Sequence, residues 1–185
     1  MAAWRSGDLI ARLRTGESLG DRVMKVDHAG EHGAVCIYRA QRFFAPWRAP
    51  GLVAELDGFL AHEQDHRARF FAELGRRGRG RCSSYHLCGG GGFLLGVVTG
   101  LAGAKAVAAT TVAIERVVLR HMLQQIEALK DSDAAATAIL REIIVEEQQH
   151  HDESVERLGG SHWSRFIDPI VAASTEAVIW LGMRL

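Results

Sequence analysis

The sequence predicts an all-α fold, a bundle of four long helices with an additional apolar helix and a C-terminal helix. Only three prolines occur in 185 residues, alanine and leucine are frequent, and the alternation typical of strands is scarce. Hydrophobic residues make up 48% and charged residues 24%, which is typical of a globular protein. We therefore expect a single domain over residues 1–185, since this length can bury a sizeable core.

The charge balance gives no support for a nucleic-acid partner. Lysine plus arginine and aspartate plus glutamate both number 22, whereas nucleic-acid binding requires a basic excess. The three cysteines, Cys36, Cys82 and Cys88, are too few for a disulfide framework, so we expect free thiols. A zinc site with His86 is the alternative, although it lacks a fourth ligand.

Apolar periodicity and helix-end signals predict the long helices in order. The first should end near Pro46, because proline does not continue a helix interior. The fourth should begin after the capping residues 131–133 and end at Gly159. Asp168–Pro169 should start or kink the last helix. The predicted ranges are 18–45, 51–76, 104–130, 133–158 and 163–183.

Three further segments are less regular. Residues 1–19 lack the apolar core of a secretory signal and form either a short amphipathic helix, with Trp4, Leu9, Ile10 and Leu13, or a flexible terminus. Residues 77–92 are rich in glycine and should link the two halves of the chain. The apolar run Phe93–Ile114, interrupted only by Lys105, is long enough to cross a bilayer. Its small residues favour a helix against the bundle or in a membrane interface over a span.

Two Glu-x-x-His motifs carry the chemistry. Residues three apart share one face of a helix, so Glu63 and His66 point the same way, as do Glu147 and His150. Glu31 precedes Glu63 by 32 residues (63 − 31), and Glu115 precedes Glu147 by 32 residues (147 − 115). This repetition indicates a duplicated helical hairpin. It is also the ligand arrangement of ferritin-like di-iron carboxylate bundles.

The four glutamates lie among apolar residues at helical spacing, which predicts that they are buried. Buried carboxylates repel each other and are costly unless compensated. Two divalent ions would neutralise four carboxylates, and the mixed oxygen and nitrogen ligands suit iron or manganese. The predicted metal ligands are Glu31, Glu63, His66, Glu115, Glu147 and His150. The alternative is a buried polar network without metal.

Neighbouring polar residues are candidates for supporting roles. Metal-bound imidazoles usually donate their outer N–H to a carboxylate or a carbonyl. Asp27 and Asp152 are candidates for that role, or else ordinary surface acids. His121, six residues after Glu115, is offset from the ligand face and is expected to line a neighbouring pocket.

Several segments resemble the demethoxyubiquinone hydroxylases of ubiquinone biosynthesis. The similarity covers about residues 20–185 and is specific, because ligands, spacings and flanks agree together. The segments that carry it are 26–34, 63–66, 111–115, 146–152 and 177–185. The resemblance implies a monooxygenase that uses O₂, two iron ions and electrons from NADH or a reduced quinone to hydroxylate a polyprenyl demethoxybenzoquinone ring. It also implies that the six residues named above are iron ligands.

The same resemblance implies a location on a membrane surface without a span. That surface would be the cytoplasmic face of the inner membrane in a bacterium or the matrix face in a mitochondrion. A lipid-binding protein or a multienzyme ubiquinone complex would be the partner, and a homo-oligomer stays open. The chain departs from the family at Met122, where many members have tyrosine, and at 81–92, where members have a proline-containing apolar linker with a tryptophan. These departures affect substrate access and electron delivery.

Three rival functions remain at this point. The first is a ferritin-like iron store or ferroxidase, which the apolar run Phe93–Ile114 fits poorly because storage shells need a polar exterior. The second is a di-iron hydroxylase of another substrate, such as a modified nucleoside. The third is a helical scaffold with a degenerate metal site.

Overall fold

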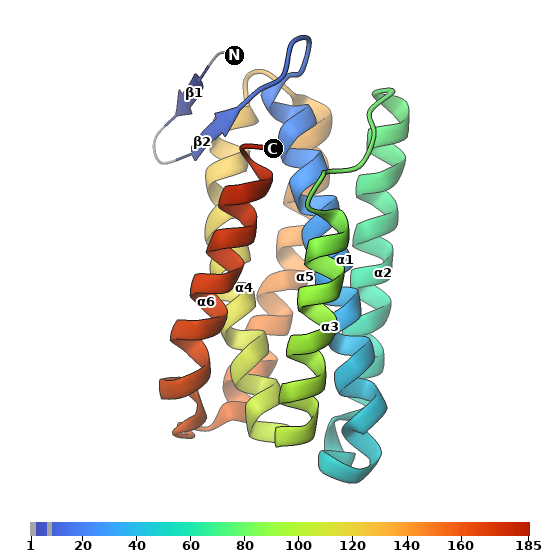
Figure 1. Cartoon of the computed structure of the whole chain (residues 1–185), viewed down its shortest axis with the longest axis vertical. Coiled ribbons are helices and arrows are strands. Elements are labelled where there is room, and N and C mark those ends of the chain that lie inside the picture. The colour runs from blue at the N-terminus through green and yellow to red at the C-terminus, as the bar shows by residue number, and fades with distance from the viewer. Residues whose placement is uncertain (1–2, 7–8) are drawn as a thin grey trace.

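The computed structural model describes residues 3–6 and 9–185, with side chains from Ala11 onward. Within these residues six α-helices run up and down along roughly parallel axes, and the two chain ends lie at the same end of the molecule (Figure 1). The helices are α1 (Leu19–Arg48), α2 (Val53–Arg76), α3 (Tyr85–Ala102), α4 (Ala104–Leu129), α5 (Ala134–Leu158) and α6 (Trp163–Gly182), with a short 3₁₀ helix η1 (Pro50–Leu52). The all-α prediction is confirmed. Helices α1, α2, α4 and α5 form the ferritin-like bundle, and α3 and α6 lie outside it.

The N-terminal segment is not a helix. Strands β1 (Ala3–Ser6) and β2 (Leu9–Arg12) pair antiparallel, with Arg5 opposite Ile10. The backbone N–H of Arg12 donates to the carbonyl of Met183 at 2.8 Å, which fixes β2 to the end of α6. The predicted amphipathic helix was therefore wrong, since so short a helix is marginal in water and the hairpin gains backbone partners. The side chains of Trp4, Leu9 and Ile10 lie outside the described part.

The predicted helix ends agree with the structure to within about two residues, except near Pro46. Asp133 caps α5 by accepting from the N–H of Ala136, and Gly159 ends it in the left-handed conformation, as predicted. Helix α1 continues past Pro46 to Arg48, within its last turn. Helix α6 begins at Trp163, so Pro169 lies inside it and does not start it.

The predicted linker over residues 77–92 was wrong in its second half. Only residues 77–84 are non-helical, and α3 begins at Tyr85. Four of its six glycines, at 89, 92, 96 and 100, face α1. A Cβ atom added at Gly92 would lie 2.4 Å from the carbonyl oxygen of Gly33, and one added at Gly96 would lie 2.4 Å from that of Ile37. The glycines at 89, 92, 96 and 100 recur three or four residues apart, so they let the two backbones approach closely.

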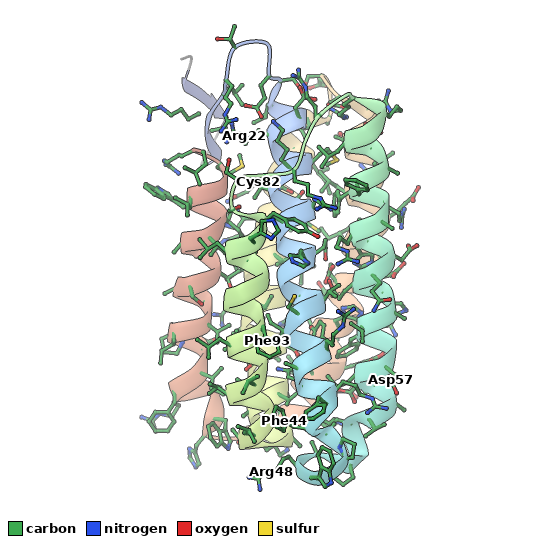
Figure 2. All side chains as sticks on the ribbon, turned by 45° about the vertical axis from the view of Figure 1, so that its right-hand side comes forward. Arg22, Phe44, Arg48, Asp57, Cys82 and Phe93 are labelled. Carbon is green, nitrogen blue, oxygen red and sulfur yellow. The ribbon has the colours of Figure 1, made fainter. Side chains whose placement is uncertain are left out.

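The apolar run Phe93–Ile114 is two helices in the structure, because Gly103 breaks it with a φ of 98°. Helix α3 is long and apolar enough to cross a membrane by length and composition alone, which is weak evidence for a span. One of its sides packs on α1. The other side exposes apolar residues, among them Phe93, which is labelled in Figure 2.

Two apolar clusters fill the bundle on either side of a polar layer. One includes Met24, Phe70, Leu129 and Leu140. The other includes Tyr38, Leu56, Phe59, Val107 and Ala113. On α1, α2 and α4 the glutamates of the predicted centre lie between the residues that belong to the two clusters. The clusters therefore fix the heights of the helices against one another at the polar layer.

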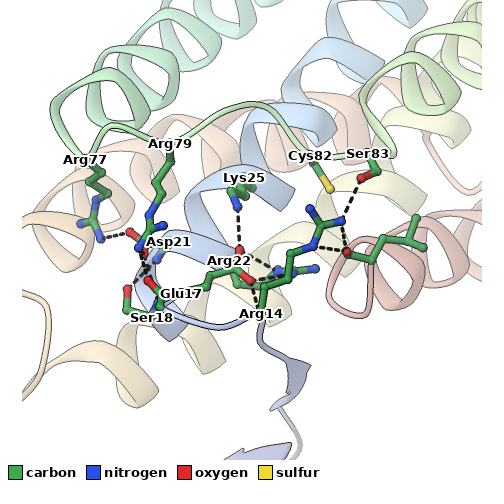
Figure 3. A network of polar contacts seen from close by, with 12 residues as sticks. Arg14, Glu17, Ser18, Asp21, Arg22, Lys25, Arg77, Arg79, Cys82 and Ser83 are labelled. Carbon is green, nitrogen blue, oxygen red and sulfur yellow. Dashed lines mark hydrogen bonds and ion pairs between the residues drawn. The ribbon is translucent and has the colours of Figure 1, made fainter. Parts of the chain in front are cut away.

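A network of charged residues joins the start of α1 to the end of α6 (Figure 3). The Glu17 carboxylate pairs with Arg22 at 2.6 Å and with Lys25 at 2.7 Å. Arg22 also donates to the carbonyl of Gly182 at 2.9 Å, and Arg14 donates to the carbonyl of Leu185 at 3.0 Å. This network positions α6 beside the bundle.

Candidate metal centre

The six side chains predicted as metal ligands converge in the polar layer. They form two groups whose potential ligand atoms lie within 4.8 Å of one another. The first group is Glu31, Glu63, His66 and Glu147, and the second is Glu63, Glu115, Glu147 and His150. Each of the six is at most 6% exposed. Two sites therefore share Glu63 and Glu147, and each adds one glutamate and one histidine of its own.

This symmetry follows from the duplicated hairpin. In the first half α1 supplies Glu31 and α2 supplies Glu63 with His66, and in the second half α4 and α5 repeat the pattern. Antiparallel helices with equal spacing bring the two halves together face to face. The Glu-x-x-His glutamates meet in the middle, which makes them the shared pair.

Both imidazoles turn Nδ1 toward the carboxylates. His66 Nδ1 lies 3.0 Å from Glu147 Oε1, and His150 Nδ1 lies 3.4 Å from Glu63 Oε1. On the outer side, His66 Nε2 lies 3.1 Å from Glu146 Oε2. Since an ionised carboxylate can only accept, Nε2 carries the proton and the lone pair of Nδ1 faces the centre. The outer nitrogen of His150, Nε2, lies 2.9 Å from His62 Nδ1, and this contact positions the His150 ring.

Neither candidate partner, Asp27 or Asp152, pairs with these imidazoles, and Asp152 is a surface acid, as the alternative expected. Asp27 accepts from Gln125 at 2.9 Å, and Asp152 lies on the surface beside Gln148. The actual partners, His62 and Glu146, directly precede the two shared glutamates in the sequence. A polar residue directly before the glutamate of each Glu-x-x-His motif was thus the clue available in the sequence. Only the packing of α2 on α5 decides that this residue faces the imidazole of the other helix.

Burial and mutual repulsion shape the charges of the centre. Burial and the neighbouring Glu63 raise the pKa of Glu31 well above its usual range. Burial and Glu147 do the same to the pKa of Glu115. For Glu147, burial opposes ionisation, but the adjacent imidazoles of His150 and His66 lower the pKa below its usual value. The chain alone therefore does not balance the charge of this centre.

Four atoms in the centre are buried without a hydrogen-bond partner, namely Glu63 Oε1, His66 Nδ1, Glu147 Oε2 and His150 Nδ1. Such atoms are costly unless something binds them. All are oxygen or imidazole nitrogen, the donors that suit iron or manganese. Cys36, Cys82 and Cys88 are free thiols and belong to neither group. The donor set therefore fits two metal ions and could hold them.

Tyr38 also belongs to the centre, and the sequence analysis did not single it out. Its hydroxyl donates to Glu115 Oε1 at 2.9 Å, and its side chain is buried. Tyr38 follows Glu31 by two helical turns and so shares its face of α1, which was the signal available. The hydrogen bond holds Glu115 in place from the opposite helix.

An apolar cavity of about 240 Å³ reaches the carboxylates from the side of α3 and α6. Its walls come from α1, α3, α4 and α6, and all four glutamates of the centre border it. His121 lines it, as predicted, and its Nε2 lies 2.9 Å from Glu176 of α6. Met122 lines it too, so the departure from tyrosine changes the wall of this cavity.

Comparison with known proteins places the chain in a family. The sequence model of the family described as "Ubiquinone biosynthesis protein COQ7" matches residues 18–182. The chain belongs to the COQ7 family. A relative from Rhodospirillum rubrum, named 3-demethoxyubiquinol 3-hydroxylase, is 32% identical over 177 residues, covering 91% of this chain and 79% of the relative.

Eukaryotic members are equally similar. Relatives from Rattus norvegicus and Homo sapiens are 34% and 32% identical, and each comparison covers 89% of this chain and 77% of the relative. Both are named NADPH-dependent 3-demethoxyubiquinone 3-hydroxylase, mitochondrial. The resemblance inferred from the motifs is thus confirmed at the level of the family.

Proposed function

We propose that the chain is a di-iron monooxygenase that hydroxylates the ring of a polyprenyl demethoxybenzoquinone in ubiquinone biosynthesis. The observation that carries the proposal is the apolar cavity, which ends on the four buried carboxylates of a centre that also contains two imidazoles. Membership of a family whose relatives are named as hydroxylases of this ring supports it. The oxidant is O₂, and the electrons come from a reduced nicotinamide nucleotide or a reduced quinone.

Glu31 and His66 would hold one ion, Glu115 and His150 the other, and Glu63 and Glu147 would be available to both. The two iron ions, when bound, supply the redox chemistry that activates O₂. The chain orients the ligands through Glu146, His62 and Tyr38. The apolar walls bind the ring and the start of the tail and exclude bulk water from the reacting atoms.

The outer faces of α3 and α6 suit a lipid surface. Leu94 and Val98 on α3 and Phe166 and Ile170 on α6 are each more than half exposed. The cavity lies between these two helices, so a substrate dissolved in the bilayer would enter directly from it. We infer a peripheral location on the cytoplasmic face of a bacterial inner membrane or the matrix face of a mitochondrial one. A lipid-binding protein or a ubiquinone-biosynthesis complex is the partner that this location suggests.

The test is a reaction with defined components. Iron-loaded protein, a short-tailed demethoxybenzoquinone, NADH or NADPH, and isotopically heavy O₂ should give a ring that has gained one heavy oxygen by mass spectrometry. Exposed Asp152 on α5 offers a matched control, since Asp152→Asn should leave product formation unchanged. Absence of product from protein that contains both ions would refute the substrate assignment. Iron oxidation without ring hydroxylation would indicate a ferroxidase instead.

A further inference from the structure

Three polar atoms of residues lining the apolar cavity are buried and have no hydrogen-bond partner. They are Asp27 Oδ2, Gln125 Oε1 and His121 Nδ1. Buried polar atoms in folded proteins are almost always hydrogen-bonded, so these three require an explanation. None belongs to the six side chains of the carboxylate centre, and two metal ions would leave all three unpartnered.

Asp27 and Gln125 form one polar unit across two helices. The side-chain amide of Gln125 donates to Asp27 Oδ1 at 2.9 Å, which fixes the carboxylate of α1 against α4. Gln125 is 1% exposed, so this bond is shielded from solvent. Oδ1 is occupied by this bond, and Oδ2 is the oxygen left for a ligand.

The unit lies beside the carboxylate centre along the cavity. Asp27 precedes Glu31 by four residues, about one turn or 6 Å along α1. Helix α4 runs in the opposite direction, so Gln125, ten residues after Glu115, lies on the same side of the centre. An aromatic ring bound next to the centre would therefore bring its far substituents to Asp27.

The remaining polar groups of the cavity wall are already engaged. The hydroxyls of Ser174 and Thr175 both donate to the carbonyl of Val171 within α6. Most of the other lining residues, such as Val118 and Ile179, are apolar. Of the three unpartnered atoms, Asp27 Oδ2 is the one that belongs to a carboxyl group, so it is the strongest acceptor outside the carboxylate centre for a hydroxyl on an aromatic ring.

The name of the Rhodospirillum rubrum relative gives a quinol as the compound hydroxylated. We propose that Asp27, held by Gln125, is the residue that accepts a hydrogen bond from a ring hydroxyl of such a quinol in this cavity. This inference rests on the proposed function, which supplies a ring with two oxygen substituents. Asp27 is then a substrate-binding residue and Gln125 a positioning residue. Discrimination follows from chemistry, because an ionised carboxylate accepts from a hydroxyl and offers no donor to a quinone carbonyl.

The test measures binding without turnover. Iron-loaded protein is titrated without O₂ and at a pH above about 7, where Asp27 is ionised although burial raises its pKa to about 7. Three probes carry the same short prenyl tail: the demethoxybenzoquinol, the corresponding quinone, and a benzene ring without oxygen substituents. Equilibrium dialysis with detection by mass spectrometry gives the three affinities.

Asp27→Asn is the informative variant, because its amide oxygen still accepts from Gln125 while an N–H₂ donor replaces Oδ2. We expect quinol affinity to fall about tenfold, since a hydrogen bond to a charged group is lost, while the affinities for quinone and benzene probes do not fall. Gln125→Leu should lower quinol affinity by about threefold to tenfold and spare the benzene probe. Asp152→Asn, on the exposed surface of α5 and outside the cavity, is the control and should leave all three affinities unchanged.

Two results would overturn the inference. One is a wild-type protein that binds the quinol no better than the benzene probe. The other is an Asp27→Asn variant that keeps the wild-type ratio of these affinities, including a variant that loses both equally, as a merely structural role predicts. Failure of the proposed function would look different, since wild-type protein would then give no hydroxylated product in the aerobic reaction.

Discussion

The molecule buries two clusters of charge, and they are compensated in opposite ways. At the start of α1, Glu17 and Arg22 are each 2% exposed in their side chains, and the chain itself provides both signs of charge. In the carboxylate centre, four glutamates face only two imidazoles. In either place, burying a charged side chain costs free energy unless an opposite charge lies beside it. The first cluster is therefore complete as folded, whereas the second needs cations from outside.

The pKa values express the same difference. Although burial opposes it, hydrogen bonds from Arg22 and the backbone of Arg14 lower the pKa of Glu17 to about 2. Burial and neighbouring carboxylates raise the pKa values of Glu31 and Glu115. A charged cluster that lowers carboxyl pKa values favours the ionised side chains in the fold, whereas one that raises them disfavours ionised carboxylates unless a cation compensates their charge.

The largest expected effect comes from a shared glutamate. Glu63→Gln keeps the shape of the side chain but removes a ligand common to both groups, so both ions should be lost. Activity should fall roughly a thousandfold or more, which corresponds to several kcal/mol. The iron content of the purified protein and the rate of hydroxylation check this.

Glu146→Gln provides the comparison within the same centre. It replaces the charged partner of the outer nitrogen of His66 by a neutral amide, so iron affinity should fall by about 10- to 100-fold while the stoichiometry at saturation stays at two. If Glu63→Gln retained two ions at saturating iron, the shared role of Glu63 would be wrong.

The next effect concerns the self-compensated cluster. Arg22→Leu leaves the Glu17 carboxylate buried with a weaker set of partners and should lower the free energy of unfolding by about 3–5 kcal/mol. Urea denaturation should show the same loss with and without iron. Arg42→Leu is the matched control on α1, because its partner Asp57 is exposed, and its loss should stay below about 1 kcal/mol. Equal losses for the two variants would contradict the comparison.

The smallest effect is a difference in pH dependence. The raised pKa values of Glu31 and Glu115 mean that their contribution to the stability of metal-free protein is full below 4.5, the usual value, and is lost as pH rises through the raised values. Bound cations compensate this loss, and they bind more tightly as the imidazoles lose protons. The gap in thermal midpoint between iron-loaded and metal-free protein should therefore widen between about pH 5 and pH 8.

Glu17 gives the opposite sign at lower pH. Its lowered pKa contributes stability above 4.5 that is lost as pH falls toward about 2, with or without iron. If the difference in thermal midpoint between iron-loaded and metal-free protein stayed constant from about pH 5 to pH 8, the carboxylates of the centre would not repel each other in the metal-free protein.

Much of this protein can be predicted from its sequence alone. Helical periodicity, capping by Asp133 and termination at Gly159 depend on neighbours in the chain, and they placed α4 and α5 within a residue or two. The equal spacing of Glu31 from Glu63 and of Glu115 from Glu147 can be read from the sequence. Helix geometry alone then places the glutamate and the histidine of each Glu-x-x-His motif on one face. The six residues of the centre could therefore be named before the fold was known. That they bind iron stays a proposal.

Contacts between distant segments decided the rest. Glycines read as a linker became the face of α3 because α1 offered a partner backbone at Gly33 and Ile37. Strands β1 and β2 paired with each other, and the end of α6 offered Met183 as a backbone acceptor for Arg12 of β2. Likewise Asp27 faces Gln125 on α4, and Glu146 from α5 serves His66 on α2. Local sequence sets which face of a helix is apolar, but the side chain that meets a polar group across the bundle depends on how the helices pack.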